Sequence, residues 1–214
     1  FNFSNDQAEM LLSSFLKSGW KHEIKYTYVF DVPSNTENAW NSIESRARNM
    51  VRKAKKSNVK IIFEENSLYV LDEFYSMMEK TFKKNNKSMH HSKEFYKNFL
   101  ETFRDNTLII SASINNITVS YGLFLFCTNE IRYISGTSTK DGNKFAAASL
   151  IQWEVIKFAI YKKIRRYDLG GGGIKSIDLF KRSFSNRKEN FHKFIKEHFF
   201  FKPFINIYLK IKNL

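Results

Sequence analysis

The chain has 214 residues, of which 43% are hydrophobic, and its 35 lysines and arginines outnumber its 21 aspartates and glutamates, for a formal charge of +14. This composition is typical of a folded domain with a sizeable core and excludes wholesale disorder. The longest apolar runs, such as 123–127, are far shorter than the roughly 20 residues that a membrane-spanning helix needs. A single cysteine, Cys127, excludes an internal disulfide and a multi-thiolate metal site.

In the first half of the chain, apolar residues at helical spacing predict a helix over 6–18. Aromatic and β-branched residues predict a strand over 26–32. Asn35 or Thr36 can cap one long helix that runs to about Lys56. The remaining elements expected in this half are a strand at 59–63 and helices at 68–84 and 92–103.

In the second half, Asn115-Asn116 suits a tight turn with positive φ between two antiparallel strands, and Thr128-Asn129 suggests a second turn of the same kind. The strands that these turns join are predicted at 107–114, 117–127 and 130–136. The later elements expected are a helix at 144–163 that is apolar on most sides, a strand at 166–169, a helix at 186–197 and a strand at 205–211. This order predicts an α/β fold, with a mixed sheet of six or seven mostly antiparallel strands and packed helices.

Basic residues gather in three clusters, at 46–56, 162–166 and 181–188. Each cluster is either a solvated helix face or a polyanion site, for the phosphates of a nucleotide sugar, coenzyme A or a tRNA acceptor stem. Four of the eight glycines lie at 170–173, where they permit positive φ and either form an anion-binding nest or serve only as a flexible turn. No Gly-Lys-Ser/Thr follows them, which excludes a P-loop and NTPase chemistry.

Three segments in the same half carry a resemblance: LIQWEVIKFA at 150–159, RYDLGG at 166–171 and FKRSF at 180–184. With the basic helix RARNMVRKAKK at 46–56, they resemble the FemABX-like branch of the GNAT acyltransferase superfamily, in order and spacing over about 26–205. The resemblance implies a GNAT-like acyltransferase domain at 26–214. The helical extension at 1–25 is then expected to be the end of a truncated first unit, which agrees with a chain that starts at Phe1 without a signal-peptide pattern.

The resemblance also implies the activity. Characterised FemABX-like proteins transfer amino acids from aminoacyl-tRNA to peptidoglycan precursors, and other relatives look like acyl-coenzyme A N-acyltransferases of envelope sugars. We therefore expect a bacterial enzyme of cell-wall biogenesis that transfers an aminoacyl or acyl group to a primary amine of a muropeptide or amino sugar. Its donor would be aminoacyl-tRNA or acyl-CoA, with no tightly bound cofactor and no metal, and it would work in the cytoplasm, with peripheral association at the inner membrane face left open. The alternative is a non-catalytic basic module that binds nucleic acid or an anionic envelope polymer.

Three residues are expected to carry the chemistry. Lys181 matches the family position that acts on the acyl end of the donor, where a cation stabilises an oxyanion or holds a terminal phosphate. Phe180 beside it would exclude water. Asp168 ends a buried strand, where it either accepts the proton of the amine or caps the glycine turn.

Further contacts with substrate are expected at Arg48, Arg52, Tyr133, Lys144, Gly170, Gly171, Gly172 and His91, the last because the relatives that the chain resembles place substrate contacts in that region. The segment 138–146 departs from the Arg/Gln-x-x-Gly-x-Gly/Ala loop with which ordinary GNAT enzymes bind coenzyme A, because it holds one glycine. Lys140 and Lys144 could still contact phosphate there, but the departure favours tRNA or an altered donor site over acetyl-CoA. His90-His91 has no convincing third ligand and predicts no metal site.

Overall fold

The computed structural model describes residues 5–89 and 91–196. The chain divides into two compact units, one of Thr27–Glu189 and a smaller one of Phe1–Tyr26 and Asn190–Leu214. Within the part of the chain that is described, no helix is both long and apolar enough to cross a membrane.

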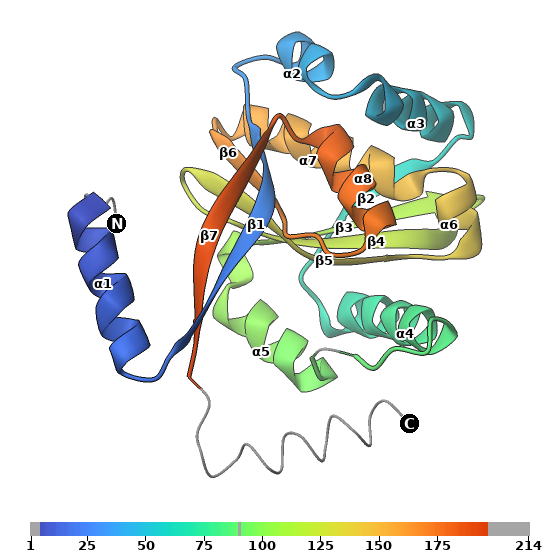
Figure 1. The fold of residues 1–214 in the computed structure, drawn as a ribbon. Coiled ribbons are helices and arrows are strands. Elements are labelled where there is room, and N and C mark those ends of the chain that lie inside the picture. The colour runs from blue at the N-terminus through green and yellow to red at the C-terminus, as the bar shows by residue number, and fades with distance from the viewer. Residues whose placement is uncertain (1–4, 90, 197–214) are drawn as a thin grey trace. The chain divides into compact units, whose positions relative to one another are not determined.

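A seven-stranded mixed sheet runs in the order β2-β3-β4-β5-β6-β1-β7 (Figure 1). Its strands are β1 (Lys21–Asp31), β2 (Lys60–Glu64), β3 (Thr107–Ile114), β4 (Ile117–Phe126), β5 (Glu130–Ser138), β6 (Arg166–Gly170) and β7 (Arg187–Ile195). Strands β2 to β5 pair antiparallel in succession, β5 and β6 pair parallel, and β6 and β1 pair antiparallel. The predicted mixed and mostly antiparallel sheet is therefore confirmed.

Helices cover both faces of this sheet (Figure 1). The helices along the described chain are α1 (Asn5–Lys17), α2 (Thr36–Ser42), α3 (Ser45–Lys56), α4 (Leu68–Lys84), α5 (Lys93–Thr102), α6 (Lys140–Lys144), α7 (Ala147–Tyr161) and α8 (Lys175–Phe184), with a 3-10 turn at Arg104–Asn106. Helix α7 packs on β3 and β4, and α3 packs on α7, whereas α4 and α5 lie on the opposite face. The sheet is therefore the middle layer of three.

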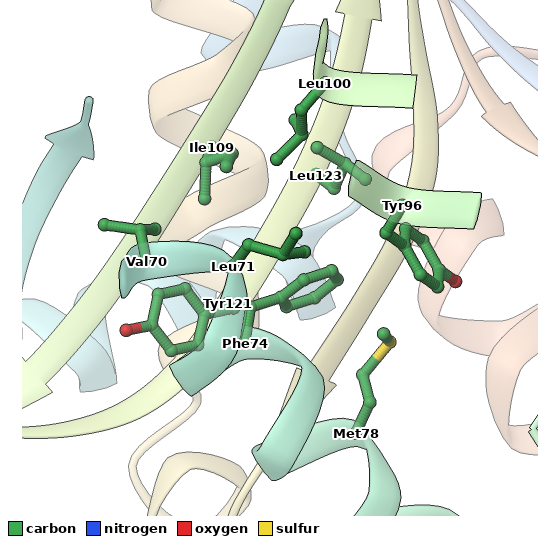
Figure 2. Close-up of a cluster of buried hydrophobic side chains, with 9 residues drawn as sticks. All are labelled: Val70, Leu71, Phe74, Met78, Tyr96, Leu100, Ile109, Tyr121 and Leu123. Atoms are coloured by element: carbon green, nitrogen blue, oxygen red, sulfur yellow. The ribbon is translucent and has the colours of Figure 1, made fainter. Parts of the chain in front are cut away.

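The layer under α4 and α5 has a well-defined apolar core (Figure 2). Phe74 and Met78 of α4 are at most 1% exposed, because their spacing turns them toward the same face of the helix. Ser67 starts that helix by accepting a hydrogen bond from the amide of Val70 at 3.3 Å. The predicted helix over 68–84 is confirmed at both ends.

The single helix predicted from Asn35 or Thr36 to Lys56 is wrong, because two helices, α2 and α3, occupy this stretch. Between them the side chain of Ile43 is 1% exposed, and the amide of Glu44 donates to the carbonyl of Ser183 at 2.9 Å. A hydrogen bond to a distant part of the chain thus replaces a bond within the helix.

The helix predicted over 186–197 is also wrong, because 187–195 forms strand β7, next to β1 in the sheet. Its start is held by Arg187, whose guanidinium pairs with Asp31 of β1 at 2.7 Å. Tertiary pairing here overrides the local apolar spacing that favours a helix. The strand predicted at 205–211 lies outside the described residues.

The turns of the β3–β5 region differ from one another. Asn115 and Asn116 have φ values of 49° and 63°, which confirms the predicted turn. Asn129 does not have a positive φ, so the second turn is not of the same kind. The long helix predicted at 144–163 begins later, at Ala147, because Ala146 takes φ 57° and separates α6 from α7.

Candidate functional site

Strands β5 and β6 pair in parallel only up to Asp168, and β6 then leads through the glycine turn into α8. Their ladder holds the pairs Glu130–Arg166, Ile131–Tyr167 and Arg132–Asp168, whereas β5 continues to Ser138. Ligands of open α/β sheets bind outside the carboxyl ends of the strands. The residues that follow this ladder therefore form the candidate site.

Lys181 of α8 reaches these strand ends. Its Nζ donates to the carbonyl oxygen of Gly171 at 2.7 Å and lies 5.7 Å from the ring centroid of Tyr133 on β5. Burial lowers the pKa of Lys181, while the negative charges of Asp168 and Asp178 act in the opposite direction. The structure thus brings Lys181, Asp168 and Tyr133 together, all three from the residues singled out in the sequence.

The side chain of Asp168 is 5% exposed and accepts several hydrogen bonds. Its Oδ1 accepts from the hydroxyl of Thr27 and from the amide of Gly170, the latter at 2.8 Å. Its Oδ2 pairs with the guanidinium of Arg132 at 3.3 Å. These contacts, in which the carboxylate only accepts, favour a cap of the glycine turn, one of the two roles that the sequence left open.

The glycine turn itself is shaped by two positive φ angles, +80° at Gly170 and +126° at Gly173. A Cβ on Gly170 would lie 3.1 Å from the Nζ of Lys181, so the missing side chain leaves room for the ammonium. The amide of Gly173 donates to Oδ2 of Asp178 at 3.2 Å. Because Asp168 and Asp178 already bind the amides of Gly170 and Gly173, a bound anion would rely on the exposed Gly171 and Gly172.

A cavity of about 310 Å³ lies on another side of α8. It is lined by Phe180, by Arg46 and Met50 of α3, and by residues around the start of α7 that include Asn143 and Ser149. No side chain caps α7, so its first amides carry the partial positive charge of a helix N-terminus toward this region. Phe180 and Lys181 are thus neighbours in the chain that lie at different places: Phe180 lines the cavity, whereas Lys181 lies against the glycine turn.

The two arginines predicted to bind substrate from α3 contact the protein itself. Arg48 donates to the carbonyl oxygens of Trp40, Asn41 and Ile43, at 3.3, 3.3 and 2.6 Å. Arg52 donates to Oδ1 of Asn49 at 3.1 Å and lies 5.3 Å from the Trp40 ring centroid. In the described residues neither arginine contacts Lys181 or Asp168.

Two other expected substrate contacts lie farther along the chain. Lys144 is exposed, with its Nζ 5.0 Å from the ring centroid of Phe145. His91 stacks on Phe95 with ring centroids 4.1 Å apart and meets the ring of Tyr96 edge-on at 6.1 Å. Residues 5–89 and 91–196 hold no group of three or more histidines, cysteines or carboxylates that suits a metal.

Sequence reasoning missed several residues of this region. Thr27 and Arg132 hold Asp168, but their proximity depends on strand register, for which the sequence carries no signal. Arg46 lines the cavity, whereas the sequence predicts substrate contacts for Arg48 and Arg52 of the same basic cluster. The helical spacing of the cluster shows that these arginines share a helix, but not which of them faces a cavity.

Comparison with protein families and solved structures shows which known proteins this chain resembles. The model of the FemAB family matches residues 16–117 and 115–200. No curated protein sequence matches the chain. The crystal structure of FemX is similar over 89% of this chain and 68% of its own, with a TM-score of 0.70 and 14% identity.

Two further solved structures share the fold. The C-terminal domain of a putative lysylphosphatidylglycerol synthetase from Agrobacterium fabrum has a TM-score of 0.64 and 10% identity, over 88% of this chain and 65% of that one. A GCN5-related glucosamine N-acetyltransferase region of a fungal multi-domain β-N-acetylglucosaminidase has a TM-score of 0.51 and 10% identity, over 88% of this chain and 22% of that one.

The chain thus spans about two thirds of the length of FemX and of the Agrobacterium domain. At these identities the structural matches show a shared GNAT-like fold, and the family model, which matches most of the chain, shows descent. This protein belongs to the FemAB family of acyltransferases.

Proposed function

We propose that this protein transfers an aminoacyl or acyl group from an activated ester to a primary amine of a cell-envelope precursor. One observation carries the proposal: Lys181 and Asp168 both bind the glycine turn that follows the β5–β6 ladder. Membership of the FemAB family supports the reaction class.

In the reaction, the neutral amine attacks the carbonyl carbon of the ester and a tetrahedral oxyanion forms. The ammonium of Lys181 would stabilise that oxyanion. Removal of one such hydrogen-bond donor typically lowers the rate by about 10²- to 10³-fold. The C–O bond of the ester then breaks, an amide remains, and the departing oxygen takes up the proton that the amine gives away. With a coenzyme A donor, the C–S bond breaks instead and the sulfur takes up that proton.

The other residues of the site would position the reactants. Phe180 and the cavity that it lines would seat the donor beside the strand ends. Asp168 would hold the turn through Gly170, so that the carbonyl of Gly171 keeps Lys181 in place. Tyr133, under the ammonium of Lys181, would form the wall toward the acceptor.

The donor is more consistent with aminoacyl-tRNA than with acetyl-CoA. The lone glycine of 138–146, Gly142, is required for packing, since a Cβ there would overlap the carbonyl oxygen of Val119 on β4. The loop also closes into α6 and does not form a glycine-rich phosphate cradle. One structural neighbour is called a lysylphosphatidylglycerol synthetase, so a lipid-linked amine or hydroxyl is a further acceptor class to include in the test.

Mass spectrometry of acceptors after incubation with each donor tests the proposal. The acceptors are a nucleotide-linked muropeptide, an amino sugar and lipid vesicles, and the donors are charged tRNA and acyl-CoA. The expected result is a new amide on an amine acceptor, with charged tRNA as donor. Absence of product with every pair would contradict the proposal.

A second candidate function is a basic module that binds a polyanion without chemistry. The last turn of α3 favours it, because Lys53, Lys55 and Lys56 are all exposed there. Such a module would bind single-stranded or transfer RNA with an affinity that falls steeply with salt, and it would form no acyl product.

A further inference from the structure

Strand β2 is the last strand on one side of the sheet, and it exposes apolar side chains there. Among the described residues it pairs with β3 alone, so its other edge offers backbone N–H and C=O groups to a further strand. Ile62 and Phe63 of this strand are 49% and 46% exposed. Native proteins usually protect such an edge, so large apolar side chains left exposed on it point to a partner.

Further apolar side chains flank this edge on both faces of the sheet. Phe63 lies on the α7 face, where its ring centroid is 6.1 Å from that of Phe158, and Tyr161 at the end of the same helix is exposed. On the opposite face, Leu68 and Tyr69 at the start of α4 are exposed, only a few residues after β2 ends. A second chain that docks along the edge therefore finds apolar surface to bury on either side of it.

The charges of β2 are arranged so that the strand is complementary to itself. Side chains alternate between the two faces of a strand, so Lys60, Ile62 and Glu64 share one face. When two copies of β2 pair antiparallel about Ile62, Lys60 of each copy lies opposite Glu64 of the other. Directly opposite side chains have Cβ atoms about 4.5–5.5 Å apart, where opposite charges attract and like charges repel.

Both charged ends are free for such a contact. The carboxylate of Glu64 accepts a hydrogen bond from the hydroxyl of Ser111 on β3, which holds it on this face of the sheet. Within residues 5–89 and 91–196, neither Lys60 nor Glu64 forms an ion pair. Pairing with a second copy would give each of them a partner of opposite charge.

We propose that β2 is the interface of a homodimer, in which the β2 strands of two copies of this chain pair antiparallel about Ile62. A strand with lysine at one end and glutamate at the other matches its own reversed sequence, which favours a second copy over another partner. A two-fold axis at Ile62 then relates the copies, as in the isologous interfaces of most homodimers. The ladder is five residues long, so the association should be weak and reversible.

The proposed dimer is independent of the proposed acyl transfer. Strands β3 and β4 lie between β2 and the candidate site at β5 and β6, so the interface leaves that site uncovered. Loss of the dimer therefore contradicts nothing in the proposed function, and loss of activity contradicts nothing in the dimer.

Analytical ultracentrifugation of the full chain tests the interface. At about 0.15 M salt, repulsion between two copies of charge +14 is screened beyond about 8 Å. The weight-average mass of the wild type should rise with concentration from that of one chain toward that of two. Lys60→Glu and Glu64→Lys should each weaken self-association at least about ten-fold, because like charges then face each other twice. Lys83→Glu, an exposed change at the far end of α4, is the matched control and should dimerise like wild type.

A mixture of the two variants gives the sharpest result. Lys60→Glu has two acidic strand ends and Glu64→Lys has two basic ones, so the mixture should form dimers that neither variant forms alone. Thermal unfolding shows that each variant is folded; if Glu64→Lys is not, because Ser111 loses its acceptor, Lys60→Glu alone decides. A wild type that stays monomeric at every concentration would overturn the proposal. A dimer that persists in Lys60→Glu, or a mixture of folded variants that stays monomeric, would overturn it as well.

Discussion

Two basic segments of this protein look alike in the sequence and act differently in the structure. Helix α3 carries the denser positive charge, yet the guanidinium of Arg48 is bound by three backbone carbonyls at the end of α2. The segment from β6 to α8 carries fewer positive charges, yet Lys181 lies beyond the β5–β6 ladder, near Asp168 and against a turn of glycines.

The difference shows that the environment of a cation is more informative than the number of cations. An arginine that donates to the carbonyls of its own chain stabilises a helix end. A lysine that burial makes less basic, beside a turn of glycines, has the properties of a reactive site. The predictions below test this assignment of structural and chemical roles.

The largest effect is expected at Lys181. Lys181→Ala should lower kcat/KM for acyl transfer by about 10²- to 10³-fold, because one charge that stabilises the oxyanion is removed. Steady-state kinetics and thermal unfolding of the same preparation are the measurements. Lys175→Ala, on an exposed lysine of the same helix, should behave like wild type. Full activity in Lys181→Ala would remove this lysine from the mechanism.

A smaller loss is expected when the lysine is displaced. Gly170→Ala places a Cβ 3.1 Å from the Nζ of Lys181 and should lower kcat about 10- to 100-fold, since a misplaced group costs much of its effect. Gly19→Ala is the matched control, because Gly19 has φ +77° against +80° at Gly170 but no atom within 4 Å of the added Cβ. If the two variants have equal activity, displacement of Lys181 does not explain a loss of kcat in Gly170→Ala, and backbone strain does.

Arg48 should matter for stability and not for catalysis. Arg48→Ala should lower the free energy of unfolding by about 1–2 kcal/mol, because three carbonyls lose a charged donor. Chemical denaturation measures this change, and Arg52→Ala, with its single hydrogen bond on an exposed surface, should have a smaller effect. A variant Arg48→Ala that keeps its stability and loses activity would place the substrate on α3.

The pH dependence should be the most subtle effect. Because burial lowers the pKa of Lys181 below the usual 10.5, the cation is lost as pH rises through that lowered pKa. The alkaline limb of kcat/KM should therefore lie below pH 10.5, and it should vanish in Lys181→Arg if that variant retains activity. The stability contribution has the opposite sign: the penalty of burying the charge is full at low pH and is relieved as Lys181 deprotonates. An identical limb in Lys181→Arg would assign the titration to another group.

Much of the fold could be predicted because local signals agree with tertiary structure there. In α4, the cap at Ser67 and the apolar spacing of Leu71, Phe74 and Met78 lead to the same helix. In β7, Phe191, Phe194 and Ile195 have helical spacing, and only the pairing with β1 makes the segment a strand.

Some residues of the candidate site could be predicted from the sequence, and others could not. Asp168 and Lys181 are joined by a short glycine turn, so their proximity follows from a strand, a turn and a helix in sequence. Thr27 and Arg132, which hold Asp168, come from two other strands, β1 and β5. Their relation to the site depends on strand order, which no local pattern encodes.

The most direct measurement is a crystal structure of the protein with a non-hydrolysable donor, such as an oligonucleotide that ends in an aminoacyl amide at its 3′ terminus. The account predicts that the amide oxygen lies within hydrogen-bond distance of Nζ of Lys181 and that the terminal nucleotide fills the cavity lined by Phe180. A donor seated on the exposed lysines of α3, with its acyl group far from Lys181, would contradict the account.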